Sequence, residues 1–422
     1  MPSCCCTPPT ALYLPPACSH HRGAAPSVFG LRGNESLPHE RRYLDAVCGS
    51  TPVNGTACFR RADTGGHLCV PSFVGLGFAK AGTTKLYELI LSRPGVAANG
   101  IKEAHFFEGR ARDRAGAEYT DFFHYLTTWN LTNAPAPVAA LGEFTPEYTS
   151  IGCEEEPTKT DKLIQRLTWL LPPSARFIFA MREPVARALS HFAYFQAIHR
   201  DINCGGLAPG NPGAESHLSH QRCSEILPRG LAAVVCHAVA KHGSSAFLHA
   251  HDRRLAATDA LAPPSTTRAP WCPTFDYSLP GYSHWDLLTP GLYHDSIAPV
   301  VARLGRERFA FVDMADIASG GALRDVEACL GLPAHAYASA QLHAPSSNAG
   351  SRAADPVAAA PAAVVRFLRR FYAPSNNLTF SLTGVGGNWV YPPEEKSSAE
   401  LLHALCRHCV RNETTRLTMS CH

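Results

Sequence analysis

Two segments with the same local pattern constrain the fold more than any other feature of the sequence. Residues 73–77 (FVGLG) form a short apolar run that ends in glycines, and residues 83–94 follow with leucine and isoleucine at helical spacing before a proline. Residues 176–181 (RFIFAM) form a second apolar run, and residues 184–198 follow with a proline at the first helical position. Two strand–loop–helix units predict a parallel sheet, because parallel strands need a crossover between them.

Later segments extend this alternation. Residues 160–173 predict the crossover helix into the second strand, with Thr160 as its N-cap. Residues 292–305 predict another helix, and residues 308–314 predict the strand after it. We therefore expect an α/β fold with a central parallel sheet, helices on both of its faces, and ligands bound in a crevice at the carboxyl ends of the strands.

Composition divides the chain into three parts. Residues 1–70 are rich in Pro, Cys, Gly and His without a sustained period, and predict an irregular extension. Residues 71–392 form the predicted main domain. It is interrupted at 201–280 by a long insertion that contains cysteines and that we expect to shape substrate access. Residues 393–422 form a tail that also contains cysteines.

Two helices are expected near the end of the chain. Residues 355–374 predict a helix that ends at Pro374, because proline stops most helices. The segment after Glu394 predicts a shorter helix capped by Ser397 or Ser398.

The composition favours a folded protein of the secretory pathway, with the Golgi as the expected compartment. Hydrophobic residues make up 45% of the 422 residues, which excludes a wholly disordered chain. The net charge of +3 is too balanced for general binding to nucleic acid or membrane surfaces. The 16 cysteines are typical of an oxidising compartment, where we expect disulfides. N-glycosylation sequons point the same way and occur at Asn34, Asn54, Asn130, Asn377 and Asn412.

The start of the chain does not agree with this location. Residues 1–21 lack the charged and then apolar layout of a signal peptide, and no run of about 18 apolar residues predicts a membrane span. Secretion would then require either a different natural N-terminus or a targeting segment elsewhere.

Residues 75–84 (GLGFAKAGTT) carry the clearest chemical signal, between the first predicted strand and its helix. Amides at a helix N-terminus, glycines, the hydroxyls of Thr83 and Thr84, and Lys80 would surround a phosphate-like anion. The segment is not the loop of NTPases, in which the lysine follows the last glycine, since Lys80 precedes Gly82. The alternative is a plain strand-to-helix turn with an exposed lysine.

A second segment follows the other predicted strand. Arg182 comes at its carboxyl end, and Ser190 lies eight residues further along the next helix, so both could face the same crevice. A guanidinium and a hydroxyl would suit a second phosphate. The alternative is an ion pair between Arg182 and Glu183 or another surface carboxylate, with Ser190 merely packed.

These segments resemble motifs of the sulfotransferases that use 3'-phosphoadenosine 5'-phosphosulfate, specifically the Golgi branch that acts on heparan, chondroitin and related carbohydrates. Residues 102–107 (KEAHFF) are similar to the Lys-Glu-x-His-Phe-Phe element of glycosaminoglycan sulfotransferases. Residues 371–378 (FYAPSNNL) are similar to the Phe-Tyr-x-Pro-x-Asn stretch near the end of that domain. The four motifs span residues 73 to about 390 in the family's order. The resemblance implies a three-layer, P-loop-like sulfotransferase fold.

The resemblance also implies a role for each matching position. The 5'-phosphosulfate would be bound by Lys80, Ala81, Gly82, Thr83 and Thr84, and the 3'-phosphate by Arg182 and Ser190. Glu103 matches the catalytic base that removes the proton of an attacking sugar hydroxyl. His105 would orient that carboxylate or the acceptor, and Lys80 would neutralise charge on the leaving 5'-phosphate. No metal is required.

The expected acceptor is a glycan or polysaccharide, and no nucleic acid partner is expected. Read without the resemblance, Glu103 is a surface carboxylate beside Lys102, and His105 is a core histidine. A non-catalytic secreted glycan-binding protein stays open. A nucleotide-dependent kinase would need Mg²⁺ ligands and a lysine followed by Ser or Thr. A small-molecule sulfotransferase of the cytosolic branch typically relies on a histidine base.

The C-terminal part departs from the family or allows two interpretations. Residues 382–389 stand where relatives often have a basic loop that contacts the nucleotide. Here either backbone amides replace those basic side chains, or the loop contributes little to nucleotide binding. Asp313 comes directly after the RFAFV run, at a position where relatives often have Glu. Arginines 366, 369 and 370 would line a groove for an anionic polysaccharide or form a solvated helix face. The crowded set His403, Cys406, His408, Cys409, Cys421 and His422 suits disulfides better than zinc.

Overall fold

The computed structural model describes residues 58–60, 67–98, 102–107, 125–126, 138–149, 158–201, 231–232, 235, 287–345, 357, 360–391 and 396–410. Its contacts divide the chain into two compact units. The first, the sheet unit, comprises Met1–Thr149, Thr158–Met181 and Val300–Gly350. The second, the helical unit, comprises Ser150–Pro157, Arg182–Pro299 and Ser351–His422.

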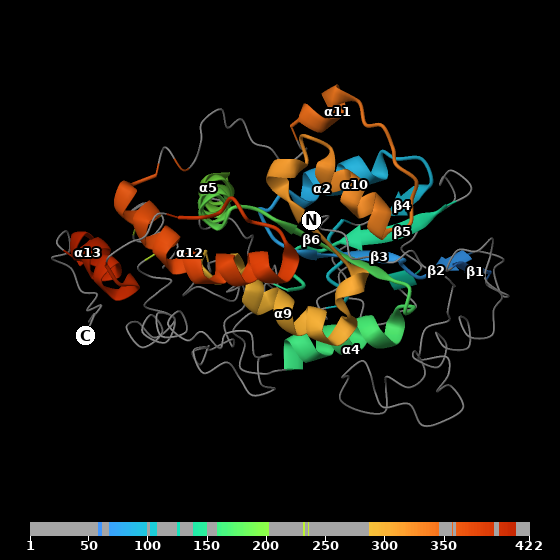
Figure 1. Ribbon diagram of the computed structural model, residues 1–422, viewed down its shortest axis with the longest axis horizontal. Coiled ribbons are helices and arrows are strands. Elements are labelled where there is room, and N and C mark those ends of the chain that lie inside the picture. The colour runs from blue at the N-terminus through green and yellow to red at the C-terminus, as the bar shows by residue number, and fades with distance from the viewer. Residues whose placement is uncertain are drawn as a thin grey trace. The chain divides into compact units, whose positions relative to one another are not determined.

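The sheet unit is built on a parallel sheet (Figure 1). Among the described residues it has five strands in the order β4-β5-β3-β6-β7. Their bounds are β3 Phe73–Gly77, β4 Val96–Ala98, β5 Ala140–Phe144, β6 Arg176–Met181 and β7 Phe309–Asp313. Every neighbouring pair in this sheet is parallel. The predicted parallel sheet is confirmed, and the two predicted strand segments form its centre as β3 and β6.

The register between β3 and β5 depends on close packing of glycine against phenylalanine. Phe73 pairs with Gly142 across the two strands, and a Cβ atom at Gly142 would lie 2.3 Å from the Phe73 ring. A larger residue at position 142 would therefore displace the ring and disturb the pairing.

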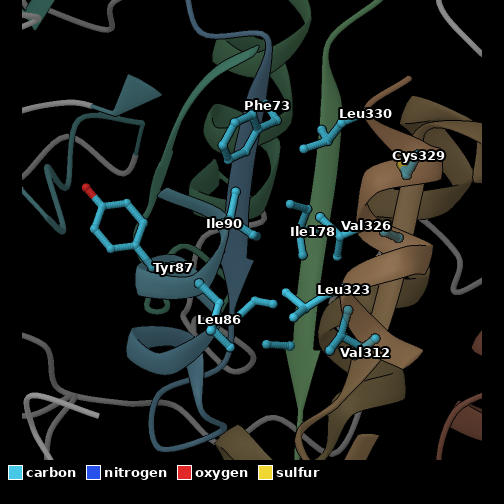
Figure 2. Packing of buried hydrophobic residues seen from close by; sticks show 14 of the residues in the cluster. Phe73, Leu86, Tyr87, Ile90, Ile178, Val312, Leu323, Val326, Cys329 and Leu330 are labelled. Carbon is cyan, nitrogen blue, oxygen red and sulfur yellow. The ribbon is translucent and has the colours of Figure 1, made fainter. Parts of the chain in front are cut away.

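One face of the sheet is covered by α2 (Thr83–Leu91) and α10 (Gly321–Cys329). Figure 2 shows Leu86 and Ile90 of α2 in one apolar cluster with Val326 of α10, against the central strands. At about 25 cal/mol per Å² of apolar area removed from water, such packing is the main source of the unit's stability. The predicted spacing of apolar residues in the first helix is confirmed.

The opposite face carries aromatic rings. The Phe179 ring lies 5.8 Å from those of Phe309 and Phe311 on the neighbouring strand. On this side lie α4 (Thr158–Leu170) and the end of α9 (Tyr293–Leu304), which Asp161 and Arg303 join by an ion pair (Figure 1). Helices therefore cover both faces, as the α/β prediction requires.

The helical unit has its own core. Helices α5 (Pro184–Asp201), α12 (Ala362–Thr383) and α13 (Ser398–Val410) contribute apolar side chains to it. Pro184 begins α5, as predicted. Ser397 caps α13, because its hydroxyl accepts the amide of Glu400 while the Glu400 carboxylate accepts the Ser397 amide. This confirms the first of the two predicted caps.

Predicted boundaries of two helices are wrong. Helix α12 begins at Ala362 and not at residue 355. It continues through Pro374 to Thr383, because Phe371, Ser375 and Thr379 continue its buried face at helical spacing. Burial of that face outweighs the cost of an internal proline, about 3 kcal/mol. Helix α4 begins at Thr158, so Thr160 lies inside its first turn and is not the N-cap.

The remaining elements are short. They are β1 (Cys58–Arg60), β2 (His67–Cys69), α11 (Ser339–His343) and the 3-10 turns η4 (Thr289–Gly291), η5 (Arg306–Arg308) and η6 (Met314–Asp316). Strands β1 and β2 pair with each other in an antiparallel sheet of their own. Cys69 is buried and takes part in a disulfide, and so does the buried Cys329.

Several predictions fall on residues that are not described. They concern nearly all of the 1–70 extension and the 201–280 insertion, and the sequons at Asn34, Asn54, Asn130 and Asn412. Asn377, by contrast, is exposed on α12. The boundaries at residues 70 and 392 stay predictions. No helix within the described ranges is long and apolar enough to cross a membrane.

Candidate functional site

The segment between β3 and α2 has the backbone expected of an anion-binding loop. Gly82 is the N-cap of α2 with φ 81°, no side chain caps the helix there, and no acidic residue lies in its first turn. A Cβ atom at Gly82 would lie 2.8 Å from Cγ of Met314, so a side chain does not fit. The loop therefore requires glycine, and its helix dipole favours a negative ligand.

The loop is anchored at both sides of Lys80. The Phe78 amide donates to the carbonyl of Ala180 on β6 at 2.8 Å, and the Ala81 amide donates back to Phe78 at 3.1 Å. Ala81 is fully buried and Thr83 nearly so, whereas Lys80 is half-buried. The backbone of Lys80 has φ 65°, in the left-handed region that non-glycine residues seldom adopt.

A second loop, residues 102–107, shares this unusual backbone. Glu103 has φ 63° and His105 has φ 54°. Within the described part of the chain, Lys80, Glu103 and His105 are the three non-glycine residues with positive φ. Each such residue costs about 1–3 kcal/mol and persists only where its surroundings impose it, most often at functional sites.

Specific hydrogen bonds hold the 102–107 loop. The His105 amide donates to Oγ1 of Thr145 at 3.4 Å, and the Phe107 amide donates to the hydroxyl of Tyr148 at 3.3 Å. Arg166 on α4 donates to the carbonyls of Phe106 and Phe107, each at 3.2 Å. The loop is thus fixed from both the turn after β5 and a helix beneath the sheet.

The turn at residues 145–149 also binds the strand that leads to Lys80. The Thr145 amide donates to the carbonyl of Gly75 at 3.0 Å, and Oγ1 of Thr149 donates to the carbonyl of Leu76 at 2.8 Å. Because β3 and β5 are parallel neighbours, this turn lies where both strands end. The structure therefore attaches the 102–107 loop and the strand that precedes Lys80 to one turn, at the edge where α/β sheets bind ligands.

Glu143, on β5, is a buried acid that the sequence analysis missed. Its carboxylate accepts hydrogen bonds from the hydroxyls of Tyr125 at 3.0 Å and Tyr148 at 2.8 Å. Burial raises the pKa of Glu143 to about 7, although hydrogen bonds from both tyrosines and from the Ala104 amide, and the charge of His105, oppose the rise. The available signal was a carboxylate in the otherwise uncharged segment 140–144.

The Glu103 side chain pairs with Lys102 and is 37% exposed. This ion pair agrees with the interpretation of Glu103 as a surface carboxylate. It does not account for the left-handed backbone of Glu103.

Arg182 and Ser190 belong to the helical unit. The Arg182 backbone is fixed by Tyr293, whose hydroxyl donates to the Arg182 carbonyl at 2.7 Å. The Glu183 carboxylate caps α5 by accepting the amides of Val185 at 3.1 Å and Ala186 at 2.6 Å. Ser190 is half-buried on α5. The roles of Arg182 and Ser190 in binding a phosphate stay predictions.

The 382–389 loop uses several of its amides internally. The amides of Gly384, Val385 and Trp389 donate to Phe380, Thr383 and Gly386. These three are therefore engaged within the loop rather than directed at a nucleotide. Asp313 caps η6 by accepting the Ala315 amide at 3.0 Å, so its role here is structural.

The C-terminal candidates remain open. Arg366 is exposed, and the Arg369 guanidinium lies 5.8 Å from the centre of the Tyr391 ring. The side chains of Cys406, His408 and Cys409, and all of Cys421 and His422, lie outside the described residues. Within the described ranges, no group of three or more His, Cys, Asp or Glu could hold a metal ion.

Comparisons with known proteins find similarity among solved structures. No family model matches the chain, and no curated protein matches it. Among solved structures, the crystal structure of a sulfotransferase from Alicyclobacillus acidocaldarius is similar to 74% of this chain and 96% of its own, at 17% identity and a TM-score of 0.38.

Proposed function

We propose that the chain is a sulfotransferase that transfers the sulfuryl group of 3'-phosphoadenosine 5'-phosphosulfate to a hydroxyl or amine of a carbohydrate. One observation carries the proposal: Lys80, Glu103 and His105, matched by the family motifs, are also the described non-glycine residues with left-handed backbone. Backbone strain at the motif positions favours a functional site over a plain strand-to-helix turn. The turn at 145–149 further connects the 102–107 loop to β3.

The residues of the Lys80 loop suit the 5'-phosphosulfate. The N-terminus of α2 carries neither a side-chain cap nor an acid, so it favours an anion. Thr83 and Thr84 supply hydroxyls beside it, and Lys80 supplies the cation. Arg182 and Ser190 are proposed to bind the 3'-phosphate through a charged fork and a hydroxyl.

The proposed reaction is a single displacement at sulfur. The acceptor oxygen or nitrogen forms a bond to sulfur while the bond between sulfur and the bridging 5'-phosphate oxygen breaks. Glu103 takes the acceptor's proton, and His105 orients that carboxylate or the acceptor. Lys80 stabilises the negative charge that develops on the leaving 3',5'-bisphosphate. No step requires a metal ion.

The acceptor class and compartment are part of the same proposal. The resemblance to glycosaminoglycan sulfotransferases favours a polysaccharide acceptor, and the 16 cysteines favour the secretory lumen, with the Golgi as the site of sulfation. The exposed sequon at Asn377 is compatible with a glycoprotein. Glycosylation of purified protein from secretory expression, detected by mass spectrometry at Asn377, would support this location.

Calorimetric titration of the full chain with 3'-phosphoadenosine 5'-phosphate tests the proposal. Micromolar binding, unchanged when Mg²⁺ is added or chelated, is expected because Lys80 and the N-terminus of α2 supply the positive charge. Binding that needs Mg²⁺ would favour a kinase instead. A folded sample that does not bind would overturn the proposal.

A non-catalytic glycan-binding protein is the second candidate, and the ion pair between Lys102 and Glu103 favours it. A binding protein needs no base, so it would bind polysaccharide without transferring labelled sulfate. Transfer above the rate without protein would exclude this candidate.

A further inference from the structure

We propose that the buried carboxylate of Glu143 is a positioning group that sets the backbone conformation of the 102–107 loop, and with it the placement of Glu103 and His105. The consequence for turnover rests on the proposed function. The coupling between Glu143 and the loop can be tested without any enzymatic activity.

Glu143 contacts the 102–107 loop directly. The Ala104 amide donates to the Glu143 carboxylate, and Ala104 lies between the two left-handed residues of the loop. A bond at this position restrains the peptide planes on both sides of Ala104. This hydrogen bond therefore lies beside the two residues whose left-handed backbone is costly, Glu103 and His105.

Glu143 also orients two hydroxyls that hold the loop. Tyr148 donates its hydroxyl proton to Glu143, so its lone pairs are left to accept the Phe107 amide. Thr145 lies 3.4 Å from the Glu143 carboxylate and likewise donates to it while accepting the His105 amide. Three amides of the loop thus depend on Glu143, one directly and two through a hydroxyl that Glu143 orients.

The ionised carboxylate is the form that makes this network complete. A carboxylate only accepts hydrogen bonds, whereas a protonated carboxyl carries a proton of its own that must find an acceptor. Protonation of Glu143 therefore displaces at least one of its donors. Since burial places the pKa of Glu143 at about 7, this exchange falls near neutral pH.

The groups that face Glu143 reinforce the coupling. Tyr125 and Tyr148 donate to it, and the charge of His105 favours its ionised form. On α2, burial and then the charge of Glu143 raise the pKa of Tyr87 to about 12. Burial and the charge of Glu143 also raise the pKa of Tyr148, so neither Tyr87 nor Tyr148 ionises near neutral pH.

The substitution Glu143→Gln separates charge from shape. An amide has one acceptor oxygen. Its NH₂ group would face a donor whose hydrogen bond the carboxylate accepts in wild type. The matched control is Glu327→Gln, which changes another buried carboxylate of the sheet unit. Glu327 lies on helix α10, and its carboxylate accepts hydrogen bonds from the Tyr337 hydroxyl and the His335 amide, each at 3.1 Å. Thr145→Val is a second variant that disturbs the same network without altering the acid.

Amide hydrogen exchange of the peptide that contains residues 102–107 gives the first readout. At pH 8 we expect exchange in the Glu143→Gln protein to be faster than in wild type by about tenfold or more, and at pH 5 we expect the two rates to converge. Glu327→Gln is expected to match wild type in this peptide, and Thr145→Val to exchange faster. Equal exchange of wild type and a folded Glu143→Gln protein at every pH would overturn the proposal. So would an equal change in the Glu327→Gln control.

Turnover gives the second readout. We expect Glu143→Gln to lower kcat at pH 8 by about 10- to 100-fold while the Kd for 3'-phosphoadenosine 5'-phosphate stays within about twofold. The limb of the kcat–pH profile near pH 7 is expected to disappear in this variant and to persist in Glu327→Gln. A limb that persists in Glu143→Gln would overturn the proposal for turnover. If wild type transfers no sulfate, the proposed function fails, and hydrogen exchange alone decides the role of Glu143.

Discussion

The hydroxyl of Tyr148 donates to the carboxylate of Glu143 over 2.8 Å. The same hydroxyl accepts the amide of Phe107, so one side chain joins strand β5 to the loop that carries Glu103 and His105. Both residues are fully buried, which protects these bonds from competition with water. A buried network beneath the 102–107 loop thus contacts its backbone.

Replacement of Gly82 by alanine tests the anion-binding loop. We expect Gly82→Ala to lower the free energy of unfolding and to weaken binding of 3'-phosphoadenosine 5'-phosphate, because the new Cβ would meet Met314 at 2.8 Å in a left-handed backbone. A loss of about 1–3 kcal/mol is expected from strain and crowding together. Urea denaturation and calorimetry measure the two effects.

Gly384→Ala is the matched control for that change. Gly384 has φ 77°, close to that of Gly82, but a Cβ atom there would have nothing within 4 Å. We expect only the conformational cost, about 1 kcal/mol, and unchanged nucleotide affinity. Equal affinity losses in both variants would refute a specific role for the Gly82 loop.

Stability should depend on pH through Glu143. In the folded protein its pKa is raised to about 7, against an ordinary value of 4.5. Between these values the folded state holds a proton that the unfolded state has released. The free energy of unfolding therefore falls as pH rises from about 4.5 to 7, by up to about 3 kcal/mol from this group, and does not fall further above it.

Urea denaturation at pH 5 and pH 8 measures this dependence as a difference between wild type and Glu143→Gln. The variant lacks the titrating group, so its stability should fall less over this range. A decrease of the same size in both proteins would show that other groups cause it.

Arg182→Ala tests the proposed contact with the 3'-phosphate. We expect it to weaken binding of 3'-phosphoadenosine 5'-phosphate by about 2–5 kcal/mol if the charged contact is desolvated. The substitution should weaken binding of adenosine 5'-phosphate much less, because this nucleotide lacks the 3'-phosphate. Calorimetry with both nucleotides separates the two, and an equal loss would contradict the assignment.

Arg366→Ala serves as the control for Arg182, because Arg366 is exposed on α12. Its affinity for the nucleotide should equal that of wild type. A rise in KM for a polysaccharide acceptor would favour the groove interpretation of this helix face, and an unchanged KM would favour a solvated face.

The central strands could be predicted because β3 and β6 are continuous apolar runs followed by glycine or proline. Strand β5 could not, because Gly142 and Glu143 interrupt its pattern. Gly142 is required by the Phe73 ring of the neighbouring strand, and Glu143 by hydroxyls that include Tyr125, 18 residues earlier. Both reasons are tertiary contacts, which local patterns do not contain.

The candidate residues themselves were found by motif, but their conformation was not. Nothing at Lys80, Glu103 or His105 signals a left-handed backbone, since these residue types disfavour it or adopt it only occasionally. The hydrogen bond that the His105 amide donates to the distant Thr145 restrains the backbone of one of them, and no local pattern signals that bond. Likewise, Pro374 signals a helix end locally, and only the buried face beyond it explains why α12 continues.

Transfer of labelled sulfate by wild type and Glu103→Gln, measured with nucleotide binding on the same preparations, tests the central claim most directly. Glu307→Gln is the control, because Glu307 is exposed just before β7, at the opposite edge of the parallel sheet. We expect Glu103→Gln to lose transfer by at least about a hundredfold while it binds 3'-phosphoadenosine 5'-phosphate as wild type does, and Glu307→Gln to retain both. Full turnover by Glu103→Gln would contradict the account.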